Sequence, residues 1–225
     1  MISSFLQNPG QTLMNILISI PGILIGLTVH EWAHAFVADK LGDPTAKNLG
    51  RMTLNPLAHV DVFGILCLLL VGFGWAKPVP VNQRNFKNTK RDDILVSIAG
   101  IVMNLLVAFI FTLLYYVILF KNVQSMRNDN MTSIIMRIIS GVFSINLSLA
   151  VFNILPIYPL DGSHILDSLL MHRLPKVCVF MHNYGRFILI ILLVSGVVSR
   201  VLGTVVNWIF SLYSSAALSL IGLFV

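Results

Sequence analysis

Long runs without Asp, Glu, Lys or Arg dominate the chain and predict membrane-spanning helices. Four of them reach the ~20 residues that an α-helix needs to cross a bilayer: Met1 to Val29, Ile94 to Phe120, Ile138 to Leu160 and Val201 to Val225. The run from Val62 to Ala76 is short and interrupted by three glycines, which favours a half-span or a re-entrant segment. The run from Phe187 to Ser199 crosses only if its flanks join it. We expect an all-α polytopic membrane protein with about five to six spans.

The polar stretches between these runs contain no repeat, low-complexity tract or separate soluble domain. We therefore predict a single integral membrane domain over 1–225, with its core at about 11–170 and a C-terminal helical hairpin at about 184–225. No cleavable signal peptide is expected, because the first thirty residues lack a positively charged leader and further membrane segments follow.

Composition supports the membrane class. Hydrophobic residues make up 56% of the chain, charged residues only 11%, and the mean hydropathy is +0.86, which excludes a disordered chain. Two distant cysteines exclude a disulfide scaffold. The net charge of +6 comes from Lys and Arg in loops, which indicates basic membrane-facing loops and no nucleic-acid partner.

The distribution of these basic residues predicts the orientation. If the Val62 to Ala76 run re-enters, eleven of the 15 basic residues lie on one side of the bilayer. The other four are Lys121, Arg127, Arg137 and Arg200. The side with the eleven is assigned to the cytoplasm, because cytoplasmic loops carry an excess of Lys and Arg.

The only glutamate of the chain, Glu31, lies in an apolar run, where an ionisable group costs several kcal/mol unless it is paired or hydrated. It belongs to the pattern His30-Glu31-Trp32-Ala33-His34. Positions i and i+4 share one face of a helix, so His30 and His34 can offer ring nitrogens to one zinc ion. Glu31 lies one step around the helix and suits a water molecule on the metal.

Two imidazoles leave a catalytic zinc site incomplete, because such a site commonly has three protein ligands. Asp161 is the candidate for the third. It follows Asn153-Ile154-Leu155-Pro156-Ile157-Tyr158-Pro159-Leu160, where prolines end a span, and it precedes Gly162, which permits a tight turn. The predicted topology brings His34 and Asp161 to similar depth on the same side. Pro-Leu-Asp-Gly is also an ordinary turn sequence, and short HExxH matches recur by chance.

Together these motifs resemble the site-2 protease family of intramembrane zinc metalloproteases, in particular short bacterial members without PDZ or CBS domains. The similarity covers about Ile23 to Leu166 and includes HEWAH and NILPIYPLDG. It extends to the stretches 55–64, 74–81 and 99–104. Val62 and Ile101 stand where the family commonly has proline, which affects local backbone shape and none of the candidate ligands.

The resemblance implies a three-helix catalytic core with one Zn²⁺ per chain. His30, His34 and Asp161 match the zinc ligands and Glu31 the catalytic glutamate, which would act as general base. Membership would also place the protein in a bacterial cell membrane, with the active site toward the cytoplasm and single-span membrane proteins as substrates. A membrane regulatory partner is one way to control it.

Several further residues are candidates for substrate binding or for orienting the site. Lys77 to Val81 alternates prolines with valines, so Val79 and Val81 belong to an extended segment that can pair with an unwound substrate by β-addition, although a plain surface loop fits the spacing equally. Asn104 and Asn153 are assigned these roles by resemblance, with helix–helix contact as the alternative.

Two further histidines lie near the candidate site in sequence. His59 is expected to support the ligands or the loop. His164 can approach the metal, although capping or lining the next helix is favoured.

Two other functions compete with proteolysis. A membrane metal-binding protein or metal transporter would also place His and Asp in spans, but its ionisable groups would be distributed along a path. An inactive adaptor related to such proteases would lack one of the four chemical residues, and all four are present.

Overall fold

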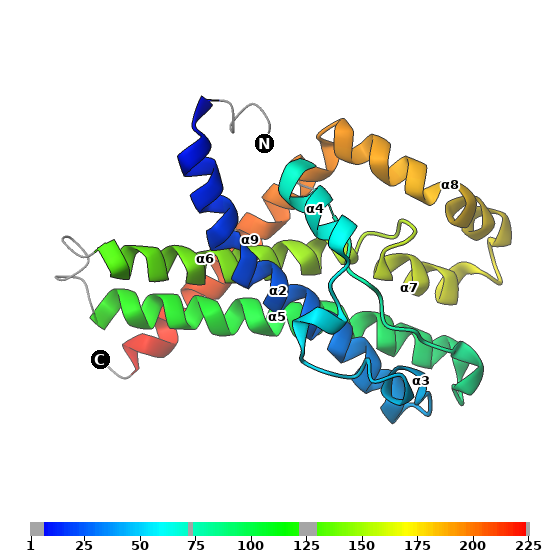
Figure 1. Ribbon diagram of the computed structural model, residues 1–225. Helices are drawn as coiled ribbons and strands as arrows, with labels where there is room; N and C mark the ends of the chain where they lie inside the picture. The colour runs from blue at the N-terminus through cyan, green and yellow to red at the C-terminus, as the bar shows by residue number, and fades with distance from the viewer. Residues whose placement is uncertain (1–6, 72–73, 122–129, 224–225) are drawn as a thin grey trace.

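The computed structural model describes residues 7–71, 74–121 and 130–223, and it is helical with no strand among them (Figure 1). Its helices are α2 (Pro9–Lys40), α3 (Thr45–Asn48), α4 (Val62–Val71), α5 (Thr89–Lys121), α6 (Asn130–Asn153), α7 (Asp161–Leu170), α8 (Pro175–Val194) and α9 (Val197–Gly222). Two 3₁₀ turns, η1 (Pro56–Ala58) and η2 (Gln83–Asn85), interrupt the loops.

Within the described residues, five helices are long and apolar enough to cross a membrane: α2, α5, α6, α8 and α9. This confirms the predicted all-α polytopic class and its span number. Ten residues of α4 rise only about 15 Å at 1.5 Å per residue, half of a hydrocarbon core of about 30 Å. The run from Val62 to Ala76 therefore holds no full span in its described part, and Gly72 lies outside the described residues.

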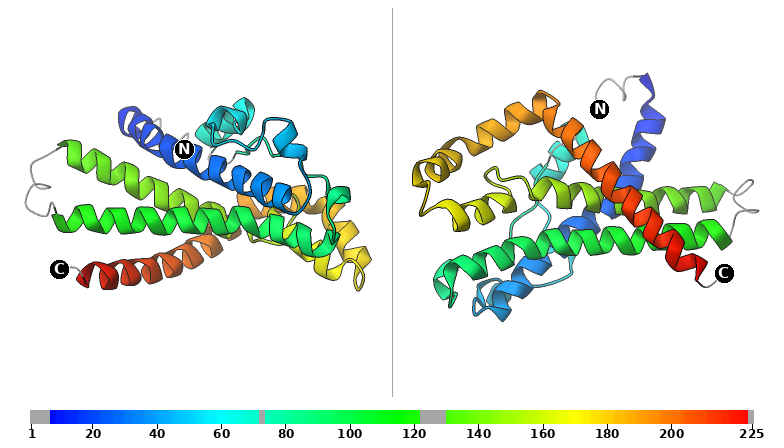
Figure 2. Two further views of the ribbon diagram at one scale, coloured as in Figure 1. Left: turned by 90° about the horizontal axis from the view of Figure 1, so that it is seen from below. Right: turned by 180° about the vertical axis from the view of Figure 1, so that it is seen from behind.

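The long helices form three layers. α5 and α6 run antiparallel side by side, α2 crosses one face of this pair, and α9 crosses the other (Figures 1 and 2). Between the middle layer and α9, a hydrophobic cluster is centred on Ala108, Phe143 and Leu147, and the rings of Phe143 and Phe210 stack with centroids 5.0 Å apart. Burial of these aromatic side chains fixes α9 against the α5–α6 pair.

The helices do not begin and end where the charge-free runs do, and α2, for example, continues to Lys40 instead of Val29. Three further boundaries have a clear local cause. α6 ends at Asn153 instead of Leu160, because Pro156 has no N–H to continue the helix and disfavours helical backbone at the residue before it. Gly196, with φ of 74°, ends α8 and begins α9, so it divides the run from Phe187 to Ser199. The predicted hairpin corresponds to α8 and α9, but α8 begins at Pro175 rather than near residue 184. Charge-free runs missed these first nine residues, about two and a half turns, because Lys176 lies among them and Arg186 lies further along the helix.

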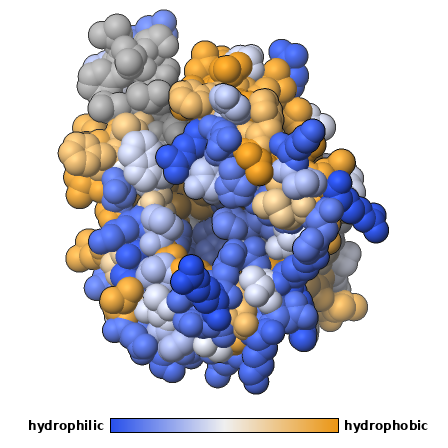
Figure 3. Space-filling model, turned by 90° about the vertical axis from the view of Figure 1, so that its right-hand side faces the viewer, coloured by the Kyte–Doolittle hydropathy of each residue, from blue (hydrophilic) through white to orange (hydrophobic). Residues whose placement is uncertain are grey.

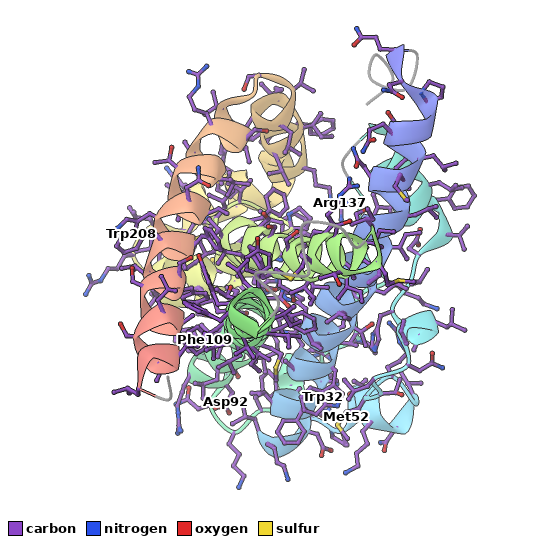
Figure 4. All side chains as sticks on the ribbon, turned by 90° about the vertical axis from the view of Figure 1, so that its left-hand side faces the viewer. Trp32, Met52, Asp92, Phe109, Arg137 and Trp208 are labelled. Atoms are coloured by element: carbon purple, nitrogen blue, oxygen red, sulfur yellow. The ribbon has the colours of Figure 1, made fainter. Side chains whose placement is uncertain are left out.

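The molecule has one polar end, formed by α3, α7 and the start of α5. Seen from this end, its surface is mostly hydrophilic and hollowed near the centre (Figure 3). Large apolar side chains elsewhere point outward, as Trp208 does from α9 with 63% of its surface exposed (Figure 4). An apolar exterior with a polar end is what a membrane protein requires, since lipid replaces water along its sides.

Candidate metal centre

His30 and His34 on α2 and Asp161 at the start of α7 converge on one point. The Nε2 atoms of the two histidines lie 3.0 Å apart, and Asp161 Oδ2 lies 3.1 Å from His30 Nε2 and 3.4 Å from His34 Nε2. Tetrahedral ligands at about 2.0–2.1 Å from a zinc ion are separated by roughly 3.3–3.4 Å. The triangle of ligand atoms therefore fits one such ion, and these three residues can hold a metal.

The hydrogen bonds of His34 decide which of its nitrogens faces this point. Nδ1 lies 2.7 Å from the carbonyl oxygen of Val96 on α5, so this nitrogen carries the hydrogen and donates it. Nε2 then directs a lone pair at the Asp161 carboxylate, an arrangement that needs a cation between the two atoms. A carbonyl that accepts from the second ring nitrogen is the common way to orient a zinc-binding histidine.

Two residues of α5 support the histidines from behind. A Cβ atom at Gly100 would lie 2.6 Å from both His30 Cε1 and His34 Nε2, so only glycine lets α5 approach the rings this closely. One turn further along α5, Asn104 is fully buried and its amide nitrogen lies 3.4 Å from His30 Nδ1. Its amide oxygen, Oδ1, is buried without a hydrogen-bond partner among the described residues. With a metal on Nε2, Nδ1 carries a hydrogen and the Asn104 side chain presents its oxygen to it.

The turn before α7 aims Asp161 at the histidines. Leu160 has extended backbone and its carbonyl accepts a 2.7 Å hydrogen bond from the Ser163 hydroxyl. A Cβ atom at Gly162 would lie 2.4 Å from the carbonyl oxygen of Ile154, so this glycine lets α7 begin directly beside the end of α6.

Glu31 is 7% exposed and lies beside the ligands on α2. Its Oε2 accepts a 2.7 Å hydrogen bond from the backbone N–H of Val79. The carboxylate is thus held within the site by a backbone donor and is directed at a space that the ligands share.

That space is a cavity of about 350 Å³. It is lined by His30, Glu31, His34, Pro78, Val79, Val81, Gln83, Asp93, Val96, Ser97, Asn153, Pro159, Asp161 and His164. Helices α2, α5 and α7 and the end of α6 supply most of the lining, and the extended segment around Val79 supplies the rest. Its size is in the range of ordinary ligand pockets.

We name residues 77–82 the strap. Hydrogen bonds hold its backbone at four points. At its start, Lys77 N–H donates to the His59 carbonyl at 2.8 Å, and Arg51 donates to the carbonyls of Lys77 (2.8 Å) and Pro78 (3.2 Å). Further along, Val79 N–H donates to Glu31, and Asn82 N–H donates to Asp43 at 2.7 Å. With the described residues, Val81 N–H and the carbonyls of Val79 and Val81 form no hydrogen bond. The strap therefore lies beside the site with unpaired backbone groups.

The structure brings together nine of the ten residues singled out from the sequence, including His164, which lines the cavity. His30, Glu31, His34, Asn153, Asp161, Val79 and Val81 line the cavity, and Asn104 contacts His30 from behind. His59 is apart from the lining: it is fully buried, its Nε2 lies 2.8 Å from the Thr53 carbonyl, and its own carbonyl holds Lys77. Its place is in the loop that supports the strap.

The sequence did not reveal three features: the hydrogen bond of the Val96 carbonyl to His34, the close approach of α5 to the rings at Gly100, and the hydrogen bonds from Arg51 to the strap. Small residues at helix contacts are a known signal, and the Ala99-Gly100 pair carries it. The contact through Val96 is made by its backbone carbonyl, so no side chain marks it in the sequence.

Two histidines from one helical turn, a carboxylate ligand from another helix and a glutamate beside them define a zinc metalloprotease site. The profile of Peptidase family M50 matches residues 18–196. The chain is 40% identical over 189 residues to the protein named "Putative zinc metalloprotease YwhC" of Bacillus subtilis (strain 168), covering 82% of this chain and 84% of that protein. No solved structure matches the chain.

Similarity extends to more distant proteins. "Putative zinc metalloprotease Rip2" of Mycolicibacterium smegmatis is 27% identical over 196 residues, which cover 85% of this chain and 72% of that protein. Its namesake in Mycobacterium tuberculosis (strain ATCC 25618 / H37Rv) is 27% identical over 198 residues, covering 86% and 73%. The chain belongs to Peptidase family M50, the site-2 protease family, and is a multi-pass membrane metalloendopeptidase with zinc as its cofactor.

Proposed function

We propose that the protein cleaves a peptide bond within or near the transmembrane segment of single-span membrane proteins, with Glu31 as the general base. One observation carries this proposal: the site lies inside a membrane-spanning helix. His30 and His34 are ten and six residues from the end of α2 at Lys40, about 9–15 Å into the helix at 1.5 Å per residue. This position on α2 favours a peptide bond within or near a membrane-spanning segment as the one cleaved.

His30, His34 and Asp161 hold the zinc ion in this proposal. Bound there, zinc supplies a Lewis acid and lowers the pKa of a water molecule toward about 7. Glu31 takes the proton of the attacking water and then delivers it to the leaving nitrogen. Asn104 and Val96 keep the two imidazoles in orientation, and Asn153 contacts the substrate from the cavity wall.

The strap binds the substrate by strand addition. A transmembrane helix hides its carbonyls in internal hydrogen bonds, so it must unwind before it is attacked, and the freed groups need partners. Val79 and Val81 have the unpaired backbone groups for this pairing next to Glu31. A substrate that takes the Val79 N–H releases Glu31 toward the water, which couples substrate binding to activation of the base.

The polar end holds the cavity lining and the start of α5, where Lys90 and Arg91 lie. By the excess of basic residues on cytoplasmic loops, we place this end in the cytoplasm and the protein in the bacterial cell membrane. The lipid bilayer is thus a partner of α8 and α9, and a membrane protein that regulates substrate access is a further partner.

The test uses the full chain in liposomes with a single-span substrate tagged at both ends. We expect fragments with the wild-type protein, none after zinc chelation, and none with Glu31→Gln, which keeps the shape of the side chain but cannot accept the proton. Zinc content measured by atomic absorption should stay at one per chain in this variant.

His172→Ala is the matched control, because His172 is exposed in the turn after α7. This variant should cleave the substrate as the wild type does. Fragments from the Glu31→Gln protein would remove Glu31 from the mechanism. Zinc movement across the vesicle without any fragments would favour a transporter instead.

A further inference from the structure

Beyond the metal ligands and Glu31, the cavity wall contains a second pair of ionisable groups, Asp93 on α5 and His164 on α7. Asp93 is 8% exposed and accepts hydrogen bonds from Gln83 Nε2 (2.7 Å) and Ser168 Oγ (3.2 Å). Its Oδ2 lies 3.8 Å from His164 Nδ1. Neither residue ligates the metal, and the mechanism described above uses neither of them.

The charge of Asp93 needs a counter-charge, because a buried carboxylate without one is costly. His164 is its only ionic partner among the described residues, since Gln83 and Ser168 are neutral. The contact with Asp93 raises the pKa of the His164 imidazole above its ordinary value, against the opposing effect of burial. The ion pair with Asp93 favours the imidazolium form of His164, in which Nδ1 is directed at Asp93 and a second N–H, at Nε2, is left to donate.

The position of His164 directs that remaining donor toward the reaction. It lies three residues after Asp161, so the two side chains share one face of α7, with Cβ atoms about 5–6 Å apart. Both line the cavity that also contains Glu31, and the His164 side chain is 42% exposed. A substrate group at the metal centre is thus within one helical turn of a charged N–H donor.

We propose that His164 donates its Nε2–H to the carbonyl oxygen of the scissile peptide, with Asp93 holding the ring in place. This inference rests on the proposed function. As the water oxygen bonds to the carbonyl carbon, the π electron pair moves onto the carbonyl oxygen and the water's proton passes to Glu31. His164 stabilises the oxygen that gains this charge; when the C–N bond breaks, the electron pair returns and the nitrogen takes the proton from Glu31.

Asn153, another side-chain donor at the cavity, is less suited to this task. Asn153 Nδ2 already donates a 3.0 Å hydrogen bond to the carbonyl of Leu149. Its remaining N–H is neutral, whereas hydrogen bonds from a charged donor are roughly twice as strong. Asn153 thus contacts the substrate, and His164 supplies the positive charge that stabilises the carbonyl oxygen.

The experiment measures kcat, KM and bound zinc for the zinc-loaded full chain on the single-span substrate. His164→Ala should lower kcat about 10²- to 10³-fold, the loss found when one oxyanion donor is removed. KM and zinc content should stay at wild-type values. His164→Gln restores a neutral N–H, which is a weaker donor, and should recover kcat only in part. Asp93→Asn should lower kcat without loss of zinc.

His172→Ala, an exposed histidine beyond the same helix, should leave all three quantities unchanged. Wild-type kcat in His164→Ala would overturn the proposal, and so would a fall in kcat that matches a loss of zinc. If His164→Ala does not fold, the comparison of His164→Gln with wild type decides: an unchanged KM with reduced kcat supports the proposal, and an equal kcat overturns it. Absence of fragments from the zinc-loaded wild-type protein would instead refute the proposed function, so the two failures are distinct.

Discussion

The metal centre and the α8–α9 hairpin differ in what holds them in place. Around the metal centre, polar groups are buried and paired through short directional contacts among α2, α5, α7 and the strap. The hairpin is mostly apolar and outward-facing: only 6% of the most apolar window of α9 is buried in the protein, against 44% for α6. Lipid therefore takes the place of protein contacts along the hairpin.

This difference teaches where the chain tolerates change. A buried polar group that loses its partner pays the cost of its own desolvation, whereas an apolar side chain that faces lipid exchanges one apolar neighbour for another. One contact between the hairpin and the catalytic end is polar, because His182 Nε2 lies 2.6 Å from Asp167 on α7. Beside it, Gly185 packs closely on Tyr158. Substitutions in the two regions should therefore have unequal effects.

The largest difference is expected between two aspartates of α7. Asp161→Ala removes one of the three ligand atoms, so zinc should be lost and cleavage abolished. Asp167→Asn only weakens the contact with His182 on α8 and should retain zinc. Zinc per chain, measured after gel filtration, checks both variants. Full zinc retention in Asp161→Ala would exclude the carboxylate as a ligand.

The next largest difference is expected between glycine-to-alanine substitutions in the two regions. In Gly100→Ala the added methyl meets the rings of His30 and His34 at 2.6 Å, so zinc affinity should fall about 10- to 100-fold, as it does when groups supporting a ligand are changed. In Gly203→Ala on α9 nothing lies within 4 Å of the added methyl, and affinity should not change. Competition with a fluorescent chelator measures both affinities. Equal affinities in the two variants would contradict the close packing of α5 on the ligands.

A smaller effect is expected from two asparagines. Asn104→Leu leaves His30 Nδ1 without its partner and should lower zinc affinity about tenfold, the smaller end of such losses. Asn207→Leu changes an exposed amide on α9 and should have no effect on zinc. The same chelator competition applies. If both variants bind zinc as wild type, the role of Asn104 is helix contact alone.

The smallest effect concerns pH. Burial opposes ionisation of Asp43, but hydrogen bonds from Thr45, Asn82 and Asn85 outweigh it and lower the pKa of the carboxyl. The folded pKa is thus below the unfolded value of about 3.9, so the stabilisation is complete above that pH and is lost as the pH falls through the folded pKa. The melting temperature of wild type should exceed that of Asp43→Asn by a few degrees at pH 7 and 6, and the gap should narrow below about pH 4. A constant gap at all pH values would argue against this linkage.

Much of the fold was predictable because the free energy of placing a residue in lipid is mostly local. The spans were found, apart from the extents of α2 and α8 and the end of α6. The error at α8 arose because long Lys and Arg side chains let a charged residue remain in a membrane helix. The error at α6 arose because charge-free runs do not register a proline that ends a helix.

The candidate site was predictable where side chains carry it. The spacing of His30 and His34 is a property of one helix, and the predicted topology brought Asp161 to their depth. The hydrogen bonds that the Val96 carbonyl and the Val79 N–H form with the site were not predictable, because every residue has similar backbone groups. Only the path of the chain decides which of them meet a ligand.

By itself, the sequence determined that this is a helical membrane protein with a histidine pair and a glutamate on one helix, since hydropathy and helical period act over short distances. Tertiary structure alone decided that α5 approaches the rings at a glycine, that the strap is held against the catalytic carboxylate, and that Asp93 holds His164 at the cavity. These features depend on contacts between residues tens of positions apart, and no local pattern encodes such contacts.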